Sequence, residues 1–299
     1  MQQDRKPVAV GLGEVLWDML PGEKQFGGAP ANFAYHAKAL GADGYVVSCV
    51  GDDPLGREIL DRLDRLELNR GCVAVDGEHP TGTVSVKLDA GGKPTYTIHE
   101  GVAWDCMAAM PGLVELAGRA DAVCFGSLAQ RSAVSRVTIR RFLAATAADC
   151  LRIFDINLRQ HYYDAETVEA SLQAASVLKL NDEELPVVAE LLSLGSTQNE
   201  EQALNVLLER YELRLIALTK GPAGSVLLAP GQSYMHGGFA TAVADTVGAG
   251  DAFTAALAMG LIDGTDLEGV NERANRIAAY VCSRPGATPD MPDELTRPS

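Results

Sequence analysis

The stretch Asp245-Thr-Val-Gly-Ala-Gly-Asp-Ala-Phe253 joins a glycine-rich turn directly to an apolar helical run. Structurally, the glycines allow a tight turn, and Asp251 in the first turn of a helix complements the positive end of the helix dipole. Chemically, such a turn exposes backbone N–H groups that bind an anion, and a carboxylate beside the anion can act as a base. The stretch therefore predicts either a capped helix or a catalytic site, and the remaining sequence decides between them.

The composition is typical of an α/β protein with a large buried core. The chain has 299 residues, of which 47% are apolar and 6% aromatic. This length fits one large domain or two small ones. The net charge is −15 and no basic block offsets it, which argues against nucleic acid or an anionic membrane surface as a partner. An anionic substrate is still compatible, because a few lysines and helix N-termini can dominate the potential of one cleft.

The start of the chain and its cysteines indicate a cytoplasmic protein. The opening MQQDRKPVAVGLG lacks the long apolar core of a signal peptide, and no apolar run reaches the length of a membrane span. The cysteines are dispersed, without a Cys-x-x-Cys pair, and several lie in apolar runs. We therefore expect buried, reduced thiols. The six cysteines are at positions 49, 72, 106, 124, 150 and 282.

Short apolar runs of strand character alternate with helical patterns along most of the chain. The strand-like runs are 8–13, 45–51, 121–127, 151–157, 175–181 and 213–221, and the helical patterns between them include 54–68, 133–148 and 200–210. Two long helical patterns, 249–262 and 267–283, follow in the final third. This alternation predicts a single α/β domain over 1–299, with a mostly parallel sheet sandwiched by helices.

The region 73–101 departs from this alternation of strands and helices. It contains TGTVSVKLD, then AGGK, then PTYTIHE, and the alternation in the first run predicts a half-exposed strand. Gly91-Gly92 predicts the turn of a β-hairpin. We expect this hairpin and the segment 14–26 to form a small inserted sheet that acts as a lid. Its apolar face needs cover, which a closed cavity or a second subunit in a homodimer would supply.

Gly27-Gly-Ala-Pro-Ala-Asn-Phe-Ala34 predicts the start of a helix. Pro30 suits the first helical position, and Gly41 suits the position after the helix end. The glycines have a plain explanation as tight-packing residues. However, two glycines followed by Asn32 in the first turn also permit the close approach of a hydroxylated ligand.

Three polar motifs follow predicted strands. They are Asp155-Ile-Asn-Leu-Arg159, Asn181-Asp-Glu-Glu184 and Thr219-Lys-Gly-Pro-Ala-Gly224. Each alone has a structural explanation, namely a local ion pair, a helix cap or a turn into the next strand. Asp18 lies just beyond the first strand, at the edge where open sheets place their ligands. The convergence of these motifs on one edge favours a single cleft over unrelated caps.

With these motifs in place, the chain resembles the ribokinase-like (PfkB) carbohydrate kinases nearly from end to end. The most specific parts are GGAPANFA at 27–34 and DTVGAGDAF at 245–253, which match the two family signatures. GDDPLG at 51–56 and the three strand-end motifs match intermediate blocks. Within the family, GEVLWDMLP and DINLR are most similar to fructokinases.

The resemblance implies a role for individual residues. Asp251 would be the catalytic base, and the amides of Gly248, Ala249 and Gly250 would form the anion hole for the transferring phosphoryl group. The sugar would be contacted by Asp18, Gly28, Asn32 and Arg159. Asn181 and Glu184 would organise Mg²⁺ and phosphates through water, Thr219, Gly221 and Gly224 would line the ATP site, and Asn275 would lie near the adenine. A monovalent cation such as K⁺ would bind beside Asp245, Val247 and the turn at 283–289.

We therefore expect an ATP-dependent sugar kinase that phosphorylates a primary hydroxyl, with D-fructose as the first candidate. A kinase for 2-keto-3-deoxygluconate, ribose or a nucleoside is the alternative within the family. A non-catalytic sugar sensor is the alternative from another class, although such a protein is expected to lack the base or the glycine turn. A dehydrogenase is disfavoured, because Gly11-Leu-Gly-Glu-Val-Leu16 lacks the last glycine of a dinucleotide fingerprint, and a P-loop motif is absent from the sequence.

Overall fold

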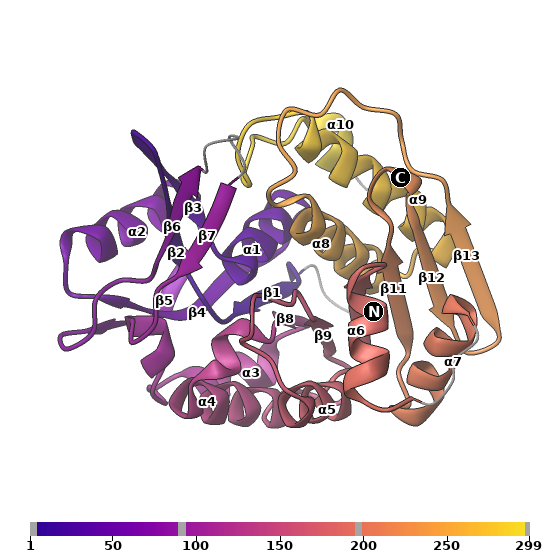
Figure 1. Cartoon of the computed structure of the whole chain (residues 1–299), viewed down its shortest axis with the longest axis horizontal. Helices are drawn as coiled ribbons and strands as arrows, with labels where there is room; N and C mark the ends of the chain where they lie inside the picture. Colours follow the sequence, from indigo (N-terminus) through magenta and orange to yellow (C-terminus); the bar gives the residue numbers. More distant parts are fainter. Residues whose placement is uncertain (1–4, 89–93, 195–198, 297–299) are drawn as a thin grey trace.

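A mostly parallel sheet forms the centre of the protein (Figure 1). The computed structural model describes residues 5–88, 94–194 and 199–296. Within these residues the sheet has nine strands in the order β13-β12-β11-β10-β9-β8-β1-β4-β5, and only the pairs β11–β12 and β12–β13 are antiparallel. The strands are β1 Val8–Leu12, β4 Asp43–Gly51, β5 Asn69–Asp76, β8 Ala122–Phe125, β9 Leu151–Asp155, β10 Val177–Asn181, β11 Leu215–Thr219, β12 Ser225–Ala229 and β13 Gln232–His236. The expected parallel sheet is confirmed.

Helices cover both faces of this sheet (Figure 1). One face carries α1 Ala29–Ala39, α8 Ala249–Ile262 and α9 Leu267–Cys282, and α2 Pro54–Arg65 packs beside α1 against β5. The other face carries α3 Leu113–Arg119, α4 Ala133–Ala144, α5 Ala165–Ala174, α6 Glu184–Leu191 and α7 Glu200–Arg210. Short helical turns η1 Ala103–Cys106, η2 Leu128–Arg131, η3 Gly221–Ala223 and α10 Asp293–Thr296 complete the described elements.

The glycines of the sequence fix how α1 approaches the sheet. Gly28 caps α1 with φ 114°, and Gly41 follows its end with φ 108°, conformations that L side chains rarely adopt. A Cβ atom on Gly11 would lie 1.8 Å from the carbonyl oxygen of Pro30, so the first turn of α1 rests directly on β1. This contact fixes the start of the helix that carries Asn32 against the sheet.

A second, smaller sheet stands beside the main one (Figure 1). Among the described residues it has four strands in the order β3-β2-β6-β7, with β2 Leu16–Leu20, β3 Glu23–Gly27, β6 Thr83–Leu88 and β7 Pro94–Ile98. β6 and β7 are antiparallel, as the hairpin pattern predicted, whereas the Gly91-Gly92 turn lies outside the described residues. The expected boundary at 73 was wrong. Residues 73–76 belong to β5, because they pair with β4 in the main sheet.

The cysteines are free, and only some of them are buried. Cys49, Cys72, Cys124 and Cys150 are buried, whereas the other two, Cys106 and Cys282, are partly exposed. The expectation of buried thiols therefore holds for four of the six. None of the helices in the described part of the chain has the length and apolar character that a membrane span requires.

Candidate active site

A cavity of about 500 Å³ lies between the small sheet and the main body. Asp18, Gly28, Asn32, Arg159 and Asp251 all contribute to its wall, so the residues expected to bind the sugar do come together with the expected base. The small sheet supplies most of the apolar side chains of the wall, namely those of Leu16, Leu20, Val84, Val86, Tyr96 and Ile98. Asp18 lies in β2 of this sheet rather than at the edge of the main sheet.

Asp251 lies in the first turn of α8 and lines the cavity. Its Oδ2 atom accepts a 2.8 Å hydrogen bond from Asn32 Nδ2. Burial raises the pKa of Asp251 to about 6, and the nearby carboxylate of Asp155 adds to the rise. A carboxylate that titrates close to neutral pH is suited to accept a proton from a hydroxyl group.

The turn before Asp251 has the geometry of an anion site. Gly248 caps α8 in the left-handed conformation with φ 80°, and an added Cβ there would lie 2.6 Å from the carbonyl oxygen of Ala287. The first N–H groups of a helix have no partner within it. At this end of α8 they belong to Ala249, Gly250 and Asp251, and the Ala249 N–H makes only a long 3.4 Å bond to the carbonyl oxygen of Thr246, so this end of the helix can present N–H groups to an anion.

A buried ion pair lies directly behind this turn. Lys179 Nζ is 3.0 Å from Asp155 Oδ1, and both side chains are less than 10% exposed. Thr254 Oγ1 donates to the other oxygen of Asp155 at 2.9 Å. Burial lowers the pKa of Lys179, but the carboxylates of Asp155 and Glu184 outweigh burial and raise it overall. A Cβ on Gly250 would lie 3.2 Å from Lys179 Nζ, so a positive charge sits beneath the anion site.

Glu14 is a site residue that the sequence did not single out. It is 4% exposed, lines the same cavity, and has no hydrogen-bond partner for Oε2 within the described residues. Burial raises the pKa of Glu14 to about 7. The Oδ1 atom of Asn32 is also buried and without a partner among the described atoms. The cavity therefore offers two acceptors that a hydroxylated ligand could satisfy.

The loop after β9 connects the lid to the cavity. Asn157 and Gln160 have positive φ values of 42° and 50°, which cost strain in residues other than glycine. Gln160 Nε2 donates to the carbonyl oxygen of Tyr96 in β7 at 2.8 Å, and both residues line the cavity. In the sequence, Arg159 lies between Asn157 and Gln160. Burial raises the pKa of Asp18 to about 6, and the charge of Arg159 opposes this rise. The expected sugar-binding arginine therefore acts on the expected aspartate across the cavity.

The predicted nucleotide residues lie at the carboxyl ends of neighbouring strands. Asn181 and Thr219 are register partners at the ends of β10 and β11. Asn181 and Glu184 bond reciprocally, because each side chain accepts the other's backbone N–H at 2.8 Å. Burial raises the pKa of Glu184, which Lys179 opposes. Gly221 has open space around it, whereas a Cβ on Gly224 would lie 1.9 Å from the carbonyl oxygen of His236.

Three further predicted residues, Asn275, Asp245 and Val247, form hydrogen bonds within the protein. Asn275 is buried in α9, where its Nδ2 donates to Ser225 Oγ at 2.7 Å, so its contact with adenine stays a prediction. Asp245 accepts the backbone N–H of Val247 at 3.0 Å and that of Gly286 at 3.1 Å. Asp245 therefore joins the glycine turn to the 283–289 turn, as a cation site there would require, and the cation itself stays a prediction.

The sequence matches the pfkB family of carbohydrate kinases over residues 12–294. The chain belongs to this family. It is 30% identical to a fructokinase of Salmonella typhimurium, in an alignment that covers 94% of this chain and 95% of the relative. Fructokinases of Escherichia coli and Klebsiella pneumoniae are 29% and 31% identical.

Solved structures of kinases share this fold. The crystal structure of an uncharacterized sugar kinase from Pyrococcus horikoshii superposes with a TM-score of 0.80 at 27% identity, covering 95% of this chain and 94% of the other. A fructokinase from Vibrio cholerae, solved with fructose, ADP and calcium ion bound, has a TM-score of 0.79 at 24% identity and covers 95% of this chain and 94% of its own. The protein is therefore a carbohydrate kinase with the ribokinase-like fold of its family.

Proposed function

We propose that this carbohydrate kinase transfers the γ-phosphate of ATP to a primary hydroxyl of D-fructose. The observation that carries the proposal is the placement of Asp251 in one cavity with two unpartnered acceptors, Glu14 Oε2 and Asn32 Oδ1. A sugar hydroxyl can donate to each of these oxygens, which removes the cost of leaving them buried and unpaired. Fructokinases among the relatives support D-fructose as that sugar.

Asp251 is the group that accepts the hydroxyl proton. Its Oδ2 is held by Asn32, so the carboxylate cannot turn away from the cavity. The backbone N–H groups at the start of α8 and the Lys179 ammonium beneath them stabilise the negative charge that develops on the transferring group. Phosphoryl transfer depends mainly on such positioning and charge stabilisation.

The polar residues at the ends of β10 and β11 fit a site for ATP and Mg²⁺, provided that Glu184 does not bind the ion directly. Crystal structures of an uncharacterized sugar kinase from Pyrococcus horikoshii and of a fructokinase from Xylella fastidiosa were solved with ATP bound. Both oxygens of Glu184 already accept backbone N–H groups, from Asn181 and from Leu158. Glu184 would therefore hold Mg²⁺ through water rather than directly, and the ion would supply charge neutralisation between the phosphates. Thr219, Gly221 and Gly224 would line the nucleotide site.

The lid excludes water from the cavity. Its apolar residues line one wall, so closure over the sugar removes the water that would otherwise hydrolyse ATP. We also propose that the outer part of the lid pairs with a second subunit, which sedimentation would detect as a dimer. A strict monomer would remove that pairing and leave the role in closure intact. We further propose a cytoplasmic location, which the free cysteines support.

A sugar panel tests the proposal. D-fructose, ribose, 2-keto-3-deoxygluconate and adenosine are each incubated with Mg-ATP, and ADP release is compared as kcat/KM. We expect the highest value for fructose, with phosphate on a primary hydroxyl in the product. A tenfold preference for another acceptor would contradict the fructose assignment. Sugar binding without ADP release would instead favour a sugar sensor.

A further inference from the structure

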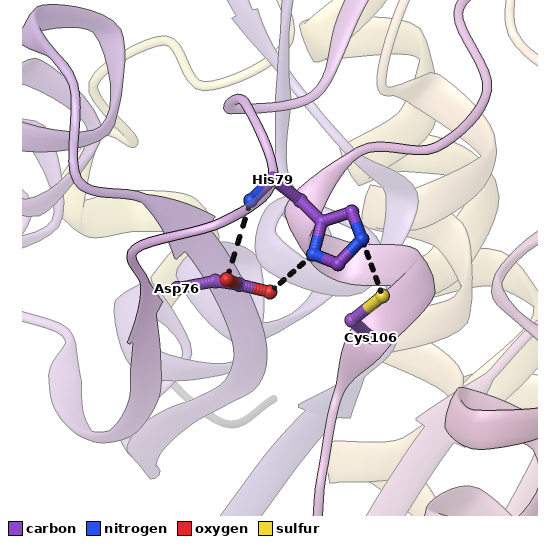
Figure 2. A group of neighbouring side chains, drawn as sticks. All are labelled: Asp76, His79 and Cys106. Carbon is purple, nitrogen blue, oxygen red and sulfur yellow. Dashed lines mark hydrogen bonds and ion pairs between the residues drawn. The ribbon is translucent and has the colours of Figure 1, made fainter.

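A cysteine, a histidine and an aspartate meet outside the sugar cavity (Figure 2). Asp76 ends β5, His79 lies in the segment that leads to β6, and Cys106 ends η1. One ligand atom from each side chain lies within 4.8 Å of the other two, and all three residues are partly exposed. Sulfur, nitrogen and oxygen atoms of these types are the ligands that Zn²⁺ takes in proteins.

The His79 ring lies between the other two side chains (Figure 2). Its Nδ1 atom is 2.8 Å from Asp76 Oδ2, and its Nε2 atom is 3.6 Å from Cys106 Sγ. A zinc ion bound at about 2.3 Å from sulfur and 2.0 Å from nitrogen, with a tetrahedral angle, sets the two ligand atoms about 3.5 Å apart. The observed separation of Sγ and Nε2 therefore fits such an ion without rearrangement.

Asp76 is fixed in a position that orients the histidine. Its Oδ1 atom accepts the backbone N–H groups of Glu78 at 2.7 Å and His79 at 3.2 Å. Its Oδ2 atom is thereby directed at His79 Nδ1. A carboxylate on one ring nitrogen fixes the tautomer and leaves the lone pair of the other nitrogen free for a metal.

Acidic groups surround Cys106. The carboxylates of Asp76, Asp105 and Glu78 lie close enough to act on its side chain electrostatically. A divalent cation held by Cys106 and His79 would be attracted by these negative charges. The ion itself deprotonates a thiol that coordinates it.

We propose that Cys106 Sγ and His79 Nε2 bind a divalent metal ion of the zinc class, with Asp76 as the positioning residue for His79. The thiol proton passes to solvent on binding, and water completes the coordination. His79 precedes β6 and Cys106 follows β7, so the ion joins the two connections between the hairpin and the main body. The site lies at the base of the lid and is separate from the sugar cavity.

Titration of the metal-free, reduced protein with Co²⁺ tests the site, because thiolate ligation produces a charge-transfer absorption band. We expect the band to saturate at one ion per chain and to disappear when Zn²⁺ is added. Cys106→Ser should abolish it. Cys282→Ser is the matched control, since Cys282 is also partly exposed and lies outside the cluster, and it should leave the band unchanged.

Two further variants test the geometry. His79→Gln should lower the affinity for Co²⁺ by at least as much as Asp76→Asn, for which the loss of an orienting carboxylate predicts a 10–100-fold decrease. Circular dichroism verifies that each variant folds. If Cys106→Ser does not fold, His79→Gln decides the result. A protein without the band, a band that survives in Cys106→Ser, or unchanged affinity in both other variants would overturn the proposal. None of these readouts depends on a sugar.

Discussion

Asn32 Nδ2 donates a 2.8 Å hydrogen bond to Asp251 Oδ2, and this bond joins two helix starts that are 219 residues apart in the sequence. The two signature motifs of the chain thus meet at a single carboxylate. Asn32 needs the glycine turn before α1, and Asp251 needs the glycine turn before α8. This relationship explains why glycines precede both residues. Each glycine turn sets the direction of the helix that follows, and thereby the direction in which Asn32 or Asp251 points.

Replacement of Asp251 by Asn should nearly abolish turnover and leave sugar binding largely intact. The amide has a similar size and can keep a bond to Asn32, but it cannot accept the hydroxyl proton. Loss of a general base lowers kcat by a factor of about 10²–10⁴. A mere interaction with the helix dipole would instead change stability by about 0.3–1 kcal/mol and leave catalysis unchanged.

The measurement is kcat together with the melting temperature. Glu268→Gln is the matched control, because Glu268 lies in the first turn of α9, is exposed and is absent from the cavity wall. It should shift the melting temperature slightly and leave kcat unchanged. If Asp251→Asn keeps kcat within a few-fold of the parent, Asp251 is only a helix residue and the proposed mechanism is wrong.

Removal of the Lys179 charge should destabilise the protein strongly. Lys179→Met leaves Asp155 buried without its cationic partner, and breaking a buried pair from one side costs about 3–5 kcal/mol. Urea denaturation measures this cost. Lys38→Met is the control, because Lys38 pairs with the exposed Glu67 on the surface, where water screens the pair and its loss costs little. Equal losses in the two variants would show that Asp155 does not depend on Lys179.

The Gln160 bond to the lid should contribute to sugar affinity. Gln160→Ala removes the hydrogen bond to the Tyr96 carbonyl, and a bond of about 0.5–1.5 kcal/mol corresponds to a rise in KM of roughly 2–10-fold. We expect kcat to change less, because Gln160 does not contact Asp251. Asn205→Ala, which removes an exposed bond within α7, is the control for steady-state kinetics. An unchanged KM in Gln160→Ala would contradict the lid's role in sugar binding.

The sequence predicted elements whose signals are local. The expected helix at 249–262 coincides with α8, because its glycine turn and apolar run are contiguous. Lys179 and Glu14 were not predicted as site residues. Lys179 lies inside an apolar strand run, and its role depends on the pairing of β10 with β9, which sets it opposite Asp155. His79 and Cys106 are 27 residues apart and meet only through the tertiary fold. The lid boundary was wrong because β5 also has strand character.

The activity should fall on acidification as Asp251 becomes protonated. Its pKa is raised to about 6, and only the ionised carboxylate can accept a proton. We therefore expect kcat/KM to decline about tenfold per pH unit below pH 6 and to level off above it. The pH profile with saturating Mg-ATP measures this. A profile that stays flat down to pH 5 would exclude Asp251 as the titrating base.

Replacement of Glu14 by Gln should stabilise the protein at high pH. Burial raises the pKa of Glu14 from 4.5 to about 7, so the folded state binds a proton more tightly than the unfolded state. The stability due to this proton is complete below pH 4.5 and is lost as the pH rises through 7. Glutamine never ionises and avoids that loss. The variant should thus gain on the order of 1–3 kcal/mol over the parent at pH 8 and little at pH 4.5.

The same substitution should leave the titration of Asp251 unchanged. Glu14 has the higher pKa, about 7 against about 6, so it is mostly protonated and neutral where Asp251 titrates. The acidic limb of kcat/KM should therefore stay near pH 6 in Glu14→Gln. Urea denaturation at pH 4.5 and pH 8 measures the effect on stability, and the pH–rate profile of Glu14→Gln measures the position of the limb. Glu268→Gln, which changes an exposed side chain outside the cavity, should show no pH-dependent gain in stability. A stability difference that is independent of pH would mean that Glu14 is ionised in the folded protein and has a partner there.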